Sequence, residues 1–282
     1  MGLPKTSIIW LNYNSVNANI IDLALESLNA VSELDYPNDK YELIVVDNAS
    51  TDGSFEKIKG FLEKKDNSRK KIIRLNKNLG FTGGINAGFK ARDRESKYVA
   101  LLNNDAIPFK ESLKTMVEYA EQYNVGGLNG IILKYGENNT IDTAGDFIDE
   151  LLYSHPVGFQ KPAPWIIRKP FYITYADGAY SLYNVNSILT CMGEKLFFDE
   201  FFAYGDDNIL GLTLWNKSYK VIAVPAVVAA HNRGSTFGRS QLSPSTYMVE
   251  RNRIALLLLT STRHKHRVGL HILRANLFKI HR

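Results

Sequence analysis

The chain has 282 residues, of which 45% are hydrophobic and 22% are charged, and its formal net charge is +5. This length and composition suit a globular protein with a substantial core. The positive charge is modest and spread along the chain, so it favours acidic ligands such as phosphates without by itself indicating nucleic acid. The single cysteine, Cys191, excludes an internal disulfide and a thiolate-rich metal site.

The N-terminal stretch MGLPKTSIIWLNYN holds a short apolar run that passes directly into polar residues. It predicts neither a secretory signal peptide nor a membrane-spanning helix at this end of the chain. Together with the low cysteine content, this pattern favours a cytoplasmic protein.

Strand and helix patterns alternate along the first 122 residues. Buried-strand patterns cover residues 7–11, 41–46, 71–75 and 98–102, and amphipathic helix patterns cover residues 20–31, 55–63, 84–92 and 111–122. This alternation predicts right-handed βαβ crossovers and a largely parallel sheet that is covered by helices on both faces.

Polar side chains follow three of these strands at the points where the strands end. They are Asn12-Tyr13-Asn14, Asp47-Asn48-Ala49-Ser50 and Asn103-Asn104-Asp105. Because ligands of parallel sheets bind beyond the carboxyl ends of the strands, the three groups should converge on one crevice. Taken alone, each group is more typical of a turn or a helix cap, and it is their conjunction that favours a ligand site.

The chemistry of these groups suits a nucleotide. A base and a ribose need a carboxylate or amide to accept their N–H and hydroxyl groups, which Asp47 can do, and a diphosphate needs a cation, which Asp105 can hold. Between them, residues 76–88 (NKNLGFTGGINAG) read as a glycine-rich loop that lets backbone approach a ligand before a helix begins. A glycine-rich loop alone is a weak signal.

Five motifs in one order, VVDNASTDGS, NLGFTGGINAGF, LLNND, FFAYGDD and AHNRGS, resemble those of family 2 glycosyltransferases, especially the rhamnosyltransferase-like branch. The resemblance covers about residues 5–260. It implies an α/β class GT-A fold, with a Rossmann-like mixed, mostly parallel sheet flanked by helices and a C-terminal helical extension. It also implies a nucleotide-sugar-binding half at 1–110, an acceptor-binding half at 111–240 and a basic amphipathic helical segment at 241–282.

By this resemblance, donor-binding residues lie at the strand ends and in the glycine-rich segment. They are Asn12, Tyr13, Asp47, Asn78, Gly83, Gly84, Asn86, Asn104 and Asp105. Asp105 corresponds to the last acid of the DXD motif, which holds Mn²⁺ or Mg²⁺ on the donor diphosphate. Asn103 stands where the first acid is usual, so weaker metal affinity is expected. His231 corresponds to the histidine that completes the metal or diphosphate site, although a lone histidine is more often structural.

The acceptor side and the chemistry fall in the second half of the chain. The resemblance gives Asp177, Gly178, Asp206 and Trp215 as acceptor-binding residues. Asp207 is the candidate base, because inverting transfer needs a carboxylate opposite the leaving diphosphate to take the acceptor's proton. Two adjacent acids at a helix start are also favoured by the helix dipole alone. Trp215 fits core packing as well as stacking on a sugar, and Ile209 stands where relatives usually have another Asp.

The C-terminal stretch has a different pattern. Residues 251–259 (RNRIALLLL) are too short an apolar run to span a bilayer, and a basic patch follows at residues 263–267. Leu270, Leu273, Leu277 and Ile280 then recur at helical spacing. We expect a basic amphipathic helix that either lies at an anionic membrane surface, at the cytoplasmic face, or packs on the catalytic domain or a second subunit.

Two functions from different classes remain. The first is a metal-dependent inverting glycosyltransferase that moves a hexose or deoxyhexose from a nucleotide-diphosphate sugar to a hydroxyl of a glycan or lipid-linked acceptor, in polysaccharide or glycoconjugate biosynthesis. The second is a catalytically silent nucleotide-sugar-binding homologue, suggested by Asn103 and Ile209. Retention of Asp105 and Asp207 favours the enzyme. A sugar-nucleotide pyrophosphorylase would carry a glycine-rich signature where this chain has NYNSVN.

Overall fold

The computed structural model describes residues 2–65, 69–137, 139–163, 167–234, 244–260, 262–270 and 272–273. The first half contains β1 (Thr6–Asn12), α1 (Ile21–Ser32), β2 (Tyr41–Asp47), α2 (Ser54–Glu63), β3 (Lys70–Arg74), α3 (Gly80–Ala91), β4 (Tyr98–Asn103), β5 (Ala106–Pro108), α4 (Ser112–Tyr123) and β6 (Gly127–Lys134). The second half contains β7 (Ile141–Thr143), β8 (Asp146–Ile148), β9 (Ser154–Pro156), β10 (Phe171–Tyr172), β11 (Tyr180–Asn184), α5 (Val185–Met192), the 3-10 helix η1 (Asp199–Phe201), α6 (Asp206–Asn216), β12 (Val221–His231), α7 (Pro244–Leu259) and the 3-10 helix η2 (Lys265–Arg267).

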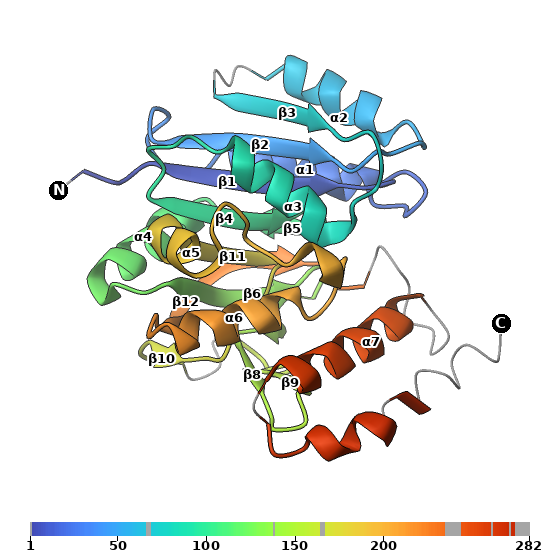
Figure 1. Cartoon of the computed structure of the whole chain (residues 1–282). Coiled ribbons are helices and arrows are strands. Elements are labelled where there is room, and N and C mark those ends of the chain that lie inside the picture. Colours follow the sequence, from blue (N-terminus) through green and yellow to red (C-terminus); the bar gives the residue numbers. More distant parts are fainter. Residues whose placement is uncertain are drawn as a thin grey trace.

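A central sheet crosses the whole molecule in the order β10-β12-β6-β11-β4-β1-β2-β3 (Figure 1). The strands β3, β2, β1 and β4 are parallel, and β12 is parallel to β6. Between these two groups lies β11, which is antiparallel to both β4 and β6. The predicted α/β fold with a mixed, mostly parallel sheet is therefore confirmed, and the halves at 1–110 and 111–240 share this one sheet.

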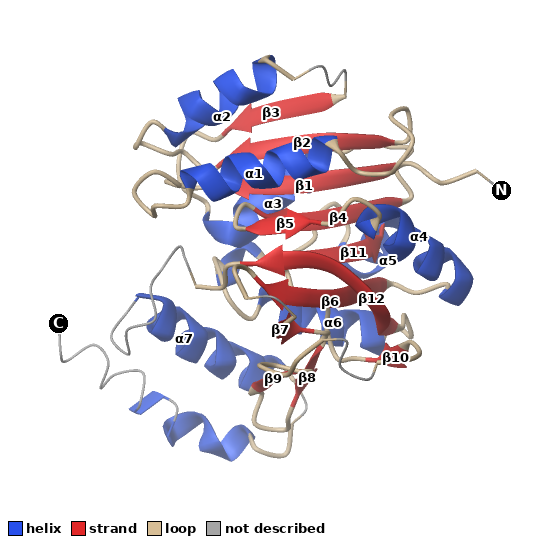
Figure 2. Cartoon of the chain, turned by 180° about the vertical axis from the view of Figure 1, so that it is seen from behind, coloured by secondary structure: helices blue, strands red, loops and turns tan. Residues whose placement is uncertain are grey.

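Helices cover both faces of the sheet, as the opposite views in Figures 1 and 2 show. One core contains buried side chains of α1, α2 and α4, and the other contains those of α3, α5 and α6. The strand β1 supplies both cores, because Ile8 and Trp10 face the first and Ile9 and Leu11 face the second. A strand buried on both sides reads as a continuous apolar run, which is why SIIWL could be recognised in the sequence.

The glycine-rich segment differs from its prediction. The helix expected at residues 84–92 begins at Gly80, so most of the supposed loop, residues 80–88, is part of α3. A Cβ added to Gly84 would lie 2.5 Å from Leu11 Cδ1, and one added to Gly88 would lie 2.6 Å from Ile9 Cγ2. These glycines therefore let α3 lie close against β1, rather than bring loop backbone to a ligand.

The helix α7 packs against the start of α6 and the β8–β9 hairpin. Leu256 and Leu257 are buried with Phe201, Ile209 and Leu152 in a small separate cluster. In the described part of the chain, no helix is both long enough and apolar enough to cross a membrane.

The end of α7 and the segment that follows it expose several large apolar side chains. Leu258, Leu259, Leu270 and Leu273 are each 58 to 66% exposed. The other two members of the predicted apolar stripe, Leu277 and Ile280, lie outside the described residues.

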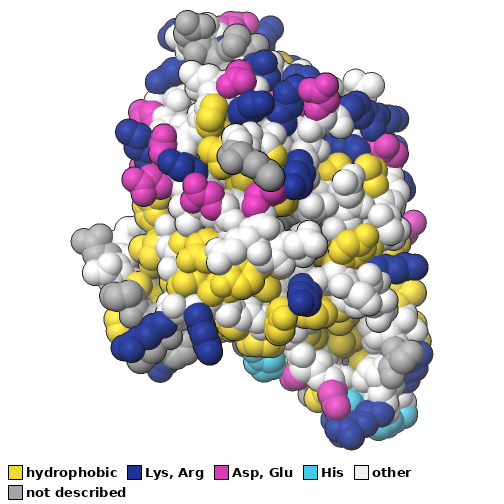
Figure 3. Space-filling view, turned by 90° about the vertical axis from the view of Figure 1, so that its left-hand side faces the viewer, with side chains coloured by type: hydrophobic (Ala, Val, Ile, Leu, Met, Phe, Trp, Pro, Cys, Tyr) yellow, Lys and Arg dark blue, Asp and Glu magenta, His cyan; other side chains and the backbone are white. Residues whose placement is uncertain are grey.

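The edge of the sheet where the parallel strands begin has a band of hydrophobic side chains across its middle (Figure 3). A hollow of about 520 Å³ at this edge is lined by residues such as Lys97, Tyr123 and Lys220, and none of its described lining residues is acidic. The strand-end acids predicted from the sequence lie at the opposite edge.

Candidate active site

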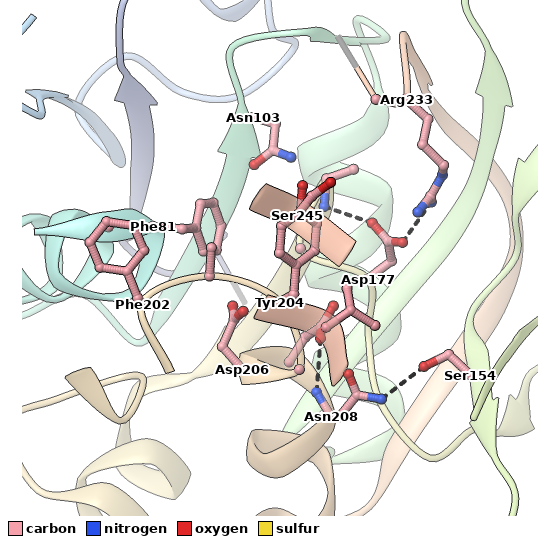
Figure 4. Close-up of a pocket in the computed structure, with 18 of the residues that line it drawn as sticks. Phe81, Asn103, Ser154, Asp177, Phe202, Tyr204, Asp206, Asn208, Arg233 and Ser245 are labelled. Atoms are coloured by element: carbon pink, nitrogen blue, oxygen red, sulfur yellow. Dashed lines mark hydrogen bonds and ion pairs between the residues drawn. The ribbon is translucent and has the colours of Figure 1, made fainter. Parts of the chain in front are cut away.

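A cavity of about 710 Å³ lies beyond the carboxyl ends of the parallel strands (Figure 4). It brings together residues that are far apart in the sequence, among them Tyr13, Asp105, Asp177, Asp207 and His231. They come from the ends of β1, β4 and β12, from the segment before β11, and from the first turn of α6. This is the location expected for a ligand site in a sheet of this topology.

Most of the residues predicted from the sequence line this cavity. They are Tyr13, Asn78, Asn104, Asp105, Asp177, Gly178, Asp206, Asp207 and His231. The remaining predicted residues do not line it; these are Asn12, Asp47, Gly83, Gly84, Asn86 and Trp215.

Asn12 and Asp47 lie directly behind the cavity wall, and both are buried. The amide of Asn12 donates to Asp47 Oδ1 at 2.8 Å and to the hydroxyls of Ser50 and Ser54 at 3.0 Å. Asp47 Oδ2 accepts the backbone N–H of Ser50 and lies 3.7 Å from the guanidinium of Arg74. Through these contacts both side chains hold the ends of β1 and β2 together.

Asn86 and Trp215 also make structural contacts instead of facing the cavity. The amide of Asn86 donates to the carbonyl oxygen of Phe197 and to Asp199, each at 2.8 Å. The indole N–H of Trp215 donates to the carbonyl oxygen of Ile173 at 2.9 Å. For Trp215 the geometry corresponds to the core-packing alternative, and Asn86 supports the segment before α6.

A chain of buried ion pairs crosses the cavity wall. Asp105 Oδ1 lies 3.3 Å from His231 Nε2, and His231 Nδ1 lies 2.9 Å from Asp142 Oδ2. Arg233 then joins Asp142, at 2.8 Å, to Asp177, at 2.7 Å. The Arg233–Asp177 pair is visible in Figure 4. Asp142 was missed in the sequence because it lies in the short strand β7, outside any recognised motif.

These contacts set the charges of the network. Burial alone would lower the pKa of His231, but the charge of Asp105 and hydrogen bonds to Asp105 and Asp142 outweigh burial and raise the pKa to about 9. Burial alone would raise the pKa of Asp142, but hydrogen bonds from His231 and Arg233 outweigh it and lower that pKa. The network is therefore made of charged groups that stabilise one another.

Asp105 and His231 fit a divalent cation that takes the place of the proton on His231 Nε2, because only the neutral imidazole is a metal ligand. Two cis ligands of an octahedral Mg²⁺, each at about 2.1 Å, lie about 3.0 Å apart, which is close to the 3.3 Å between Asp105 Oδ1 and His231 Nε2. Asp142 holds the other ring nitrogen and so fixes the imidazole, as carboxylates commonly do behind metal-bound histidines. Since the described residues contain no cluster of three or more acidic, His or Cys ligands, the other ligands would come from a diphosphate and water.

Asp206 and Asp207 occupy the first turn of α6 and line the same cavity as Asp105. Burial and the charge of Asp177 raise the pKa of Asp206 to about 7. Burial and the charges of Asp206, Asp177 and Asp146 raise the pKa of the half-buried Asp207 well above that of an ordinary aspartate. Carboxyl groups with raised pKa values in a cavity are typical of acid–base sites.

The loop before these acids is held by α7. Phe202 and Tyr204 both have positive φ values, 65° and 68°, so the backbone here needs support. The amide nitrogen of Asn252 donates to the carbonyl oxygens of Phe201, Ala203 and Tyr204 at 3.0, 2.8 and 2.6 Å. Asn252 could not be predicted from the sequence, because the stretch RNRIALLLL contains no motif that indicates a contact with a loop about 50 residues earlier.

The sequence of the chain matches the profile of glycosyl transferase family 2 over residues 7–182. It is 26% identical over 202 residues to the dolichyl N-acetyl-alpha-D-glucosaminyl phosphate 3-beta-D-2,3-diacetamido-2,3-dideoxy-beta-D-glucuronosyltransferase of Methanococcus voltae, covering 70% of this chain and 59% of the relative. An uncharacterised glycosyltransferase of Nostoc sp. is 32% identical over 141 residues, covering 50% of this chain and 40% of that protein. The chain thus spans roughly half the length of these relatives.

Solved structures show the same fold at low sequence identity. A mannosyltransferase from Pyrobaculum calidifontis, in complex with GDP-Man and Mn²⁺, has a TM-score of 0.63 and 18% identity, covering 98% of this chain and 70% of its own. TarS of S. aureus, in complex with UDP-GlcNAc, has a TM-score of 0.62 and 17% identity, covering 93% of this chain and 69% of its own. The family profile covers more than half of the chain and the fold agrees with it, so the chain belongs to glycosyltransferase family 2 and has the GT-A fold.

Proposed function

We propose that this protein is a metal-dependent, inverting glycosyltransferase that moves a hexosyl or deoxyhexosyl group from a nucleotide-diphosphate sugar to a hydroxyl of a glycan or lipid-linked acceptor. The observation that carries the proposal is the presence of two different pairs of side chains in one cavity. The Asp105–His231 pair fits a cation, and Asp206 with Asp207 forms a pair of carboxyl groups with raised pKa values.

The donor would occupy the side of the cavity formed by the ends of β1 and β4. Tyr13, Asn78 and Asn104 line this side beside Asp105. Mn²⁺ or Mg²⁺, held by Asp105 and His231, would offset the charge of the donor diphosphate and of the leaving nucleotide. The bound GDP-Man and Mn²⁺ of the Pyrobaculum protein and the UDP-GlcNAc of TarS support this kind of donor.

Asp207 is the proposed base. A carboxylate with a raised pKa takes a proton from an acceptor hydroxyl more readily than an ordinary aspartate does, provided that it is ionised at the working pH. Attack from the Asp207 side with the diphosphate leaving toward Asp105 is a single displacement, which inverts the anomeric carbon. Asp177 and Gly178 lie along the same cavity and would contact the sugar or the acceptor.

The test is a transfer reaction with UDP-, GDP- and dTDP-sugars in the presence of Mn²⁺. Release of the nucleotide diphosphate, dependent on both Mn²⁺ and an acceptor, is expected, and proton NMR of the product should show the inverted anomer. Tight donor binding without any release, for every donor and acceptor tried, would instead identify the catalytically silent homologue. A product with the donor's configuration would overturn inversion.

The loop contact of Asn252 gives a prediction for turnover. Asn252→Asp keeps the side chain's shape but removes its N–H donors and sets a carboxylate against three carbonyl oxygens. We expect turnover to fall about tenfold or more, because the acids after the loop lose their position, while nucleotide binding changes little. Amide hydrogen exchange of residues 199–207 should also become faster.

The matched control is Asn186→Asp, the same change at an exposed position of α5. It should leave both turnover and exchange unaltered. Unchanged exchange at residues 199–207 in a folded Asn252→Asp variant would contradict the role given to Asn252.

We also propose peripheral contact with anionic membrane through the C-terminal segment. Arg263, Lys265 and Arg267 lie in this segment, close in sequence to the exposed Leu270 and Leu273. Deletion after Thr262 should abolish binding to vesicles of phosphatidylglycerol and phosphatidylcholine without abolishing nucleotide binding. Equal vesicle binding by the shortened protein would contradict the contact, and loss of folding would favour a packed helix.

A further inference from the structure

We propose that Arg253 forms a binding subsite for a phosphate group of the acceptor, on the wall of the cavity that α7 provides. This inference rests on the proposed glycosyl transfer and specifies its acceptor as a molecule that carries a phosphate ester near the hydroxyl that is glycosylated.

One face of α7 forms part of the cavity wall. Ser245, Thr246, Val249, Arg253 and Leu256 all line the cavity, and the steps of three to four residues from Thr246 to Leu256 place these side chains along one side of the helix. This helix lies outside the residues matched by the family profile, which end at residue 182. The family match therefore assigns no role to this wall.

Arg253 is the basic residue of this wall, and its guanidinium is held in place. The side chain is 7% exposed, its Nη2 pairs with the carboxylate of Glu250, and its Cζ lies 4.0 Å from the centroid of the Tyr153 ring. Its Nη1 is buried and has no hydrogen-bond partner among the described residues. A buried donor without an acceptor is unfavourable. Because Arg253 lines the cavity, a ligand oxygen that displaces the side chains covering Nη1 would become its partner.

The charge and shape of a guanidinium favour a phosphate group as the ligand. Arginine stays charged at all working pH values and its planar fork matches the geometry of phosphate oxygens. The residues beside it, Leu152, Val249 and Leu256, are apolar and would exclude water from such a contact. Because carboxylates of the α6 turn repel anions, a phosphorylated ligand would direct its phosphate to Arg253 and its hydroxyl to Asp207.

The position of Arg253 favours the acceptor over the donor diphosphate. Its ring partner Tyr153 is next in sequence to Ser154, whose hydroxyl accepts a hydrogen bond of 2.9 Å from Asn208 (Figure 4). Asn208 directly follows the proposed base, Asp207. The phosphate subsite is thus tied to the segment that carries the proposed base, whereas the proposed cation ligands Asp105 and His231 come from the ends of β4 and β12.

The required phosphate ester has two sources, a soluble sugar phosphate and a lipid-linked phosphate. Calorimetry with glucose 1-phosphate and with octyl phosphate distinguishes them, and octyl glucoside serves as the neutral probe. The proteins are the unaltered chain, Arg253→Gln, Arg253→Lys and Arg94→Gln. Arg94 is the matched control, because it is 63% exposed and pairs with Glu194 outside the cavity.

We expect Arg253→Gln to weaken binding of at least one phosphate probe about tenfold or more, Arg253→Lys to weaken it less, and Arg94→Gln to leave it unchanged. Preference for octyl phosphate would indicate the lipid-linked source, and preference for glucose 1-phosphate the soluble one. The inference is overturned if the unaltered protein binds neither phosphate probe, or if folded Arg253→Gln binds them as tightly as the unaltered protein.

Measurements of nucleotide binding distinguish a failure of the acceptor subsite from a failure of the proposed glycosyl transfer. UDP or GDP with Mn²⁺ should bind Arg253→Gln as tightly as the unaltered chain. A large loss of that binding would assign Arg253 to the donor diphosphate and overturn the acceptor subsite. Absence of nucleotide binding in the unaltered chain would instead contradict the proposed function itself.

Discussion

Asp207→Asn is expected to lower turnover about a hundredfold or more while donor affinity stays close to that of the unaltered protein. The substitution keeps the size of the side chain and much of its hydrogen bonding, but an amide cannot accept the proton of the acceptor hydroxyl. The base acts only as bonds change, so its loss affects the transition state and leaves the ground-state contacts of the donor in place.

The pH dependence of turnover supplies a second measurement on the same residue. Burial and the neighbouring charges of Asp206, Asp177 and Asp146 raise the pKa of Asp207. A base works only when ionised, so a raised pKa moves the loss of activity on acidification to higher pH. In the unaltered protein, the rate should therefore fall at a pH well above the ordinary range for aspartate, and Asp207→Asn should lack this limb.

The neighbouring acid provides the matched control. Asp206→Asn makes the same chemical change one residue earlier in the same helical turn, and we expect a milder loss of turnover. By removing one source of like charge, it should also shift the acid limb to lower pH. The assignment of Asp207 is contradicted if Asp207→Asn turns over at a near-normal rate with a genuine acceptor.

The fold was predictable where local pattern and tertiary environment agree. A strand buried on both faces, such as β1, must be apolar at every position. The continuous apolar run Ile8, Ile9, Trp10 and Leu11 indicates such a strand even when the segments that pack against it are not known. The polar residues after such strands identify the carboxyl edge of the sheet, which is why Tyr13 and Asp105 could be placed together.

The parts that could not be predicted depend on contacts between distant segments. Glycines such as Gly84 and Gly88 are typical of a loop. Both lie in α3, where only glycine allows the helix to pack so close to β1. Asp142 acquires its importance from two side chains some 90 residues away, and Asn252 from the carbonyls of a loop about 50 residues away. Neither set of contacts produces a hydrophobic periodicity or a motif spacing that can be recognised in the sequence.

Asp105→Ala is expected to remove most Mn²⁺-dependent nucleotide binding, by about tenfold or more, while the fold survives. Asp105 is the carboxylate at the end of β4 that lies next to His231 Nε2, so its loss leaves the imidazole as the remaining member of the pair. Calorimetry with UDP or GDP, measured with and without Mn²⁺, reports this change independently of turnover.

Two further variants test whether the effect comes from the cation. Asn103→Asp adds a second acid to the LLNND motif, and because Asn103 lines the cavity it should strengthen Mn²⁺-dependent binding. Asp142→Asn should weaken that binding less than Asp105→Ala does, since it disturbs the orientation of His231 and the pairing with Arg233 but removes neither proposed metal ligand. If Asp105→Ala is folded and binds nucleotide with an undiminished response to Mn²⁺, the cation is held elsewhere and the donor site proposed around Asp105 is wrong.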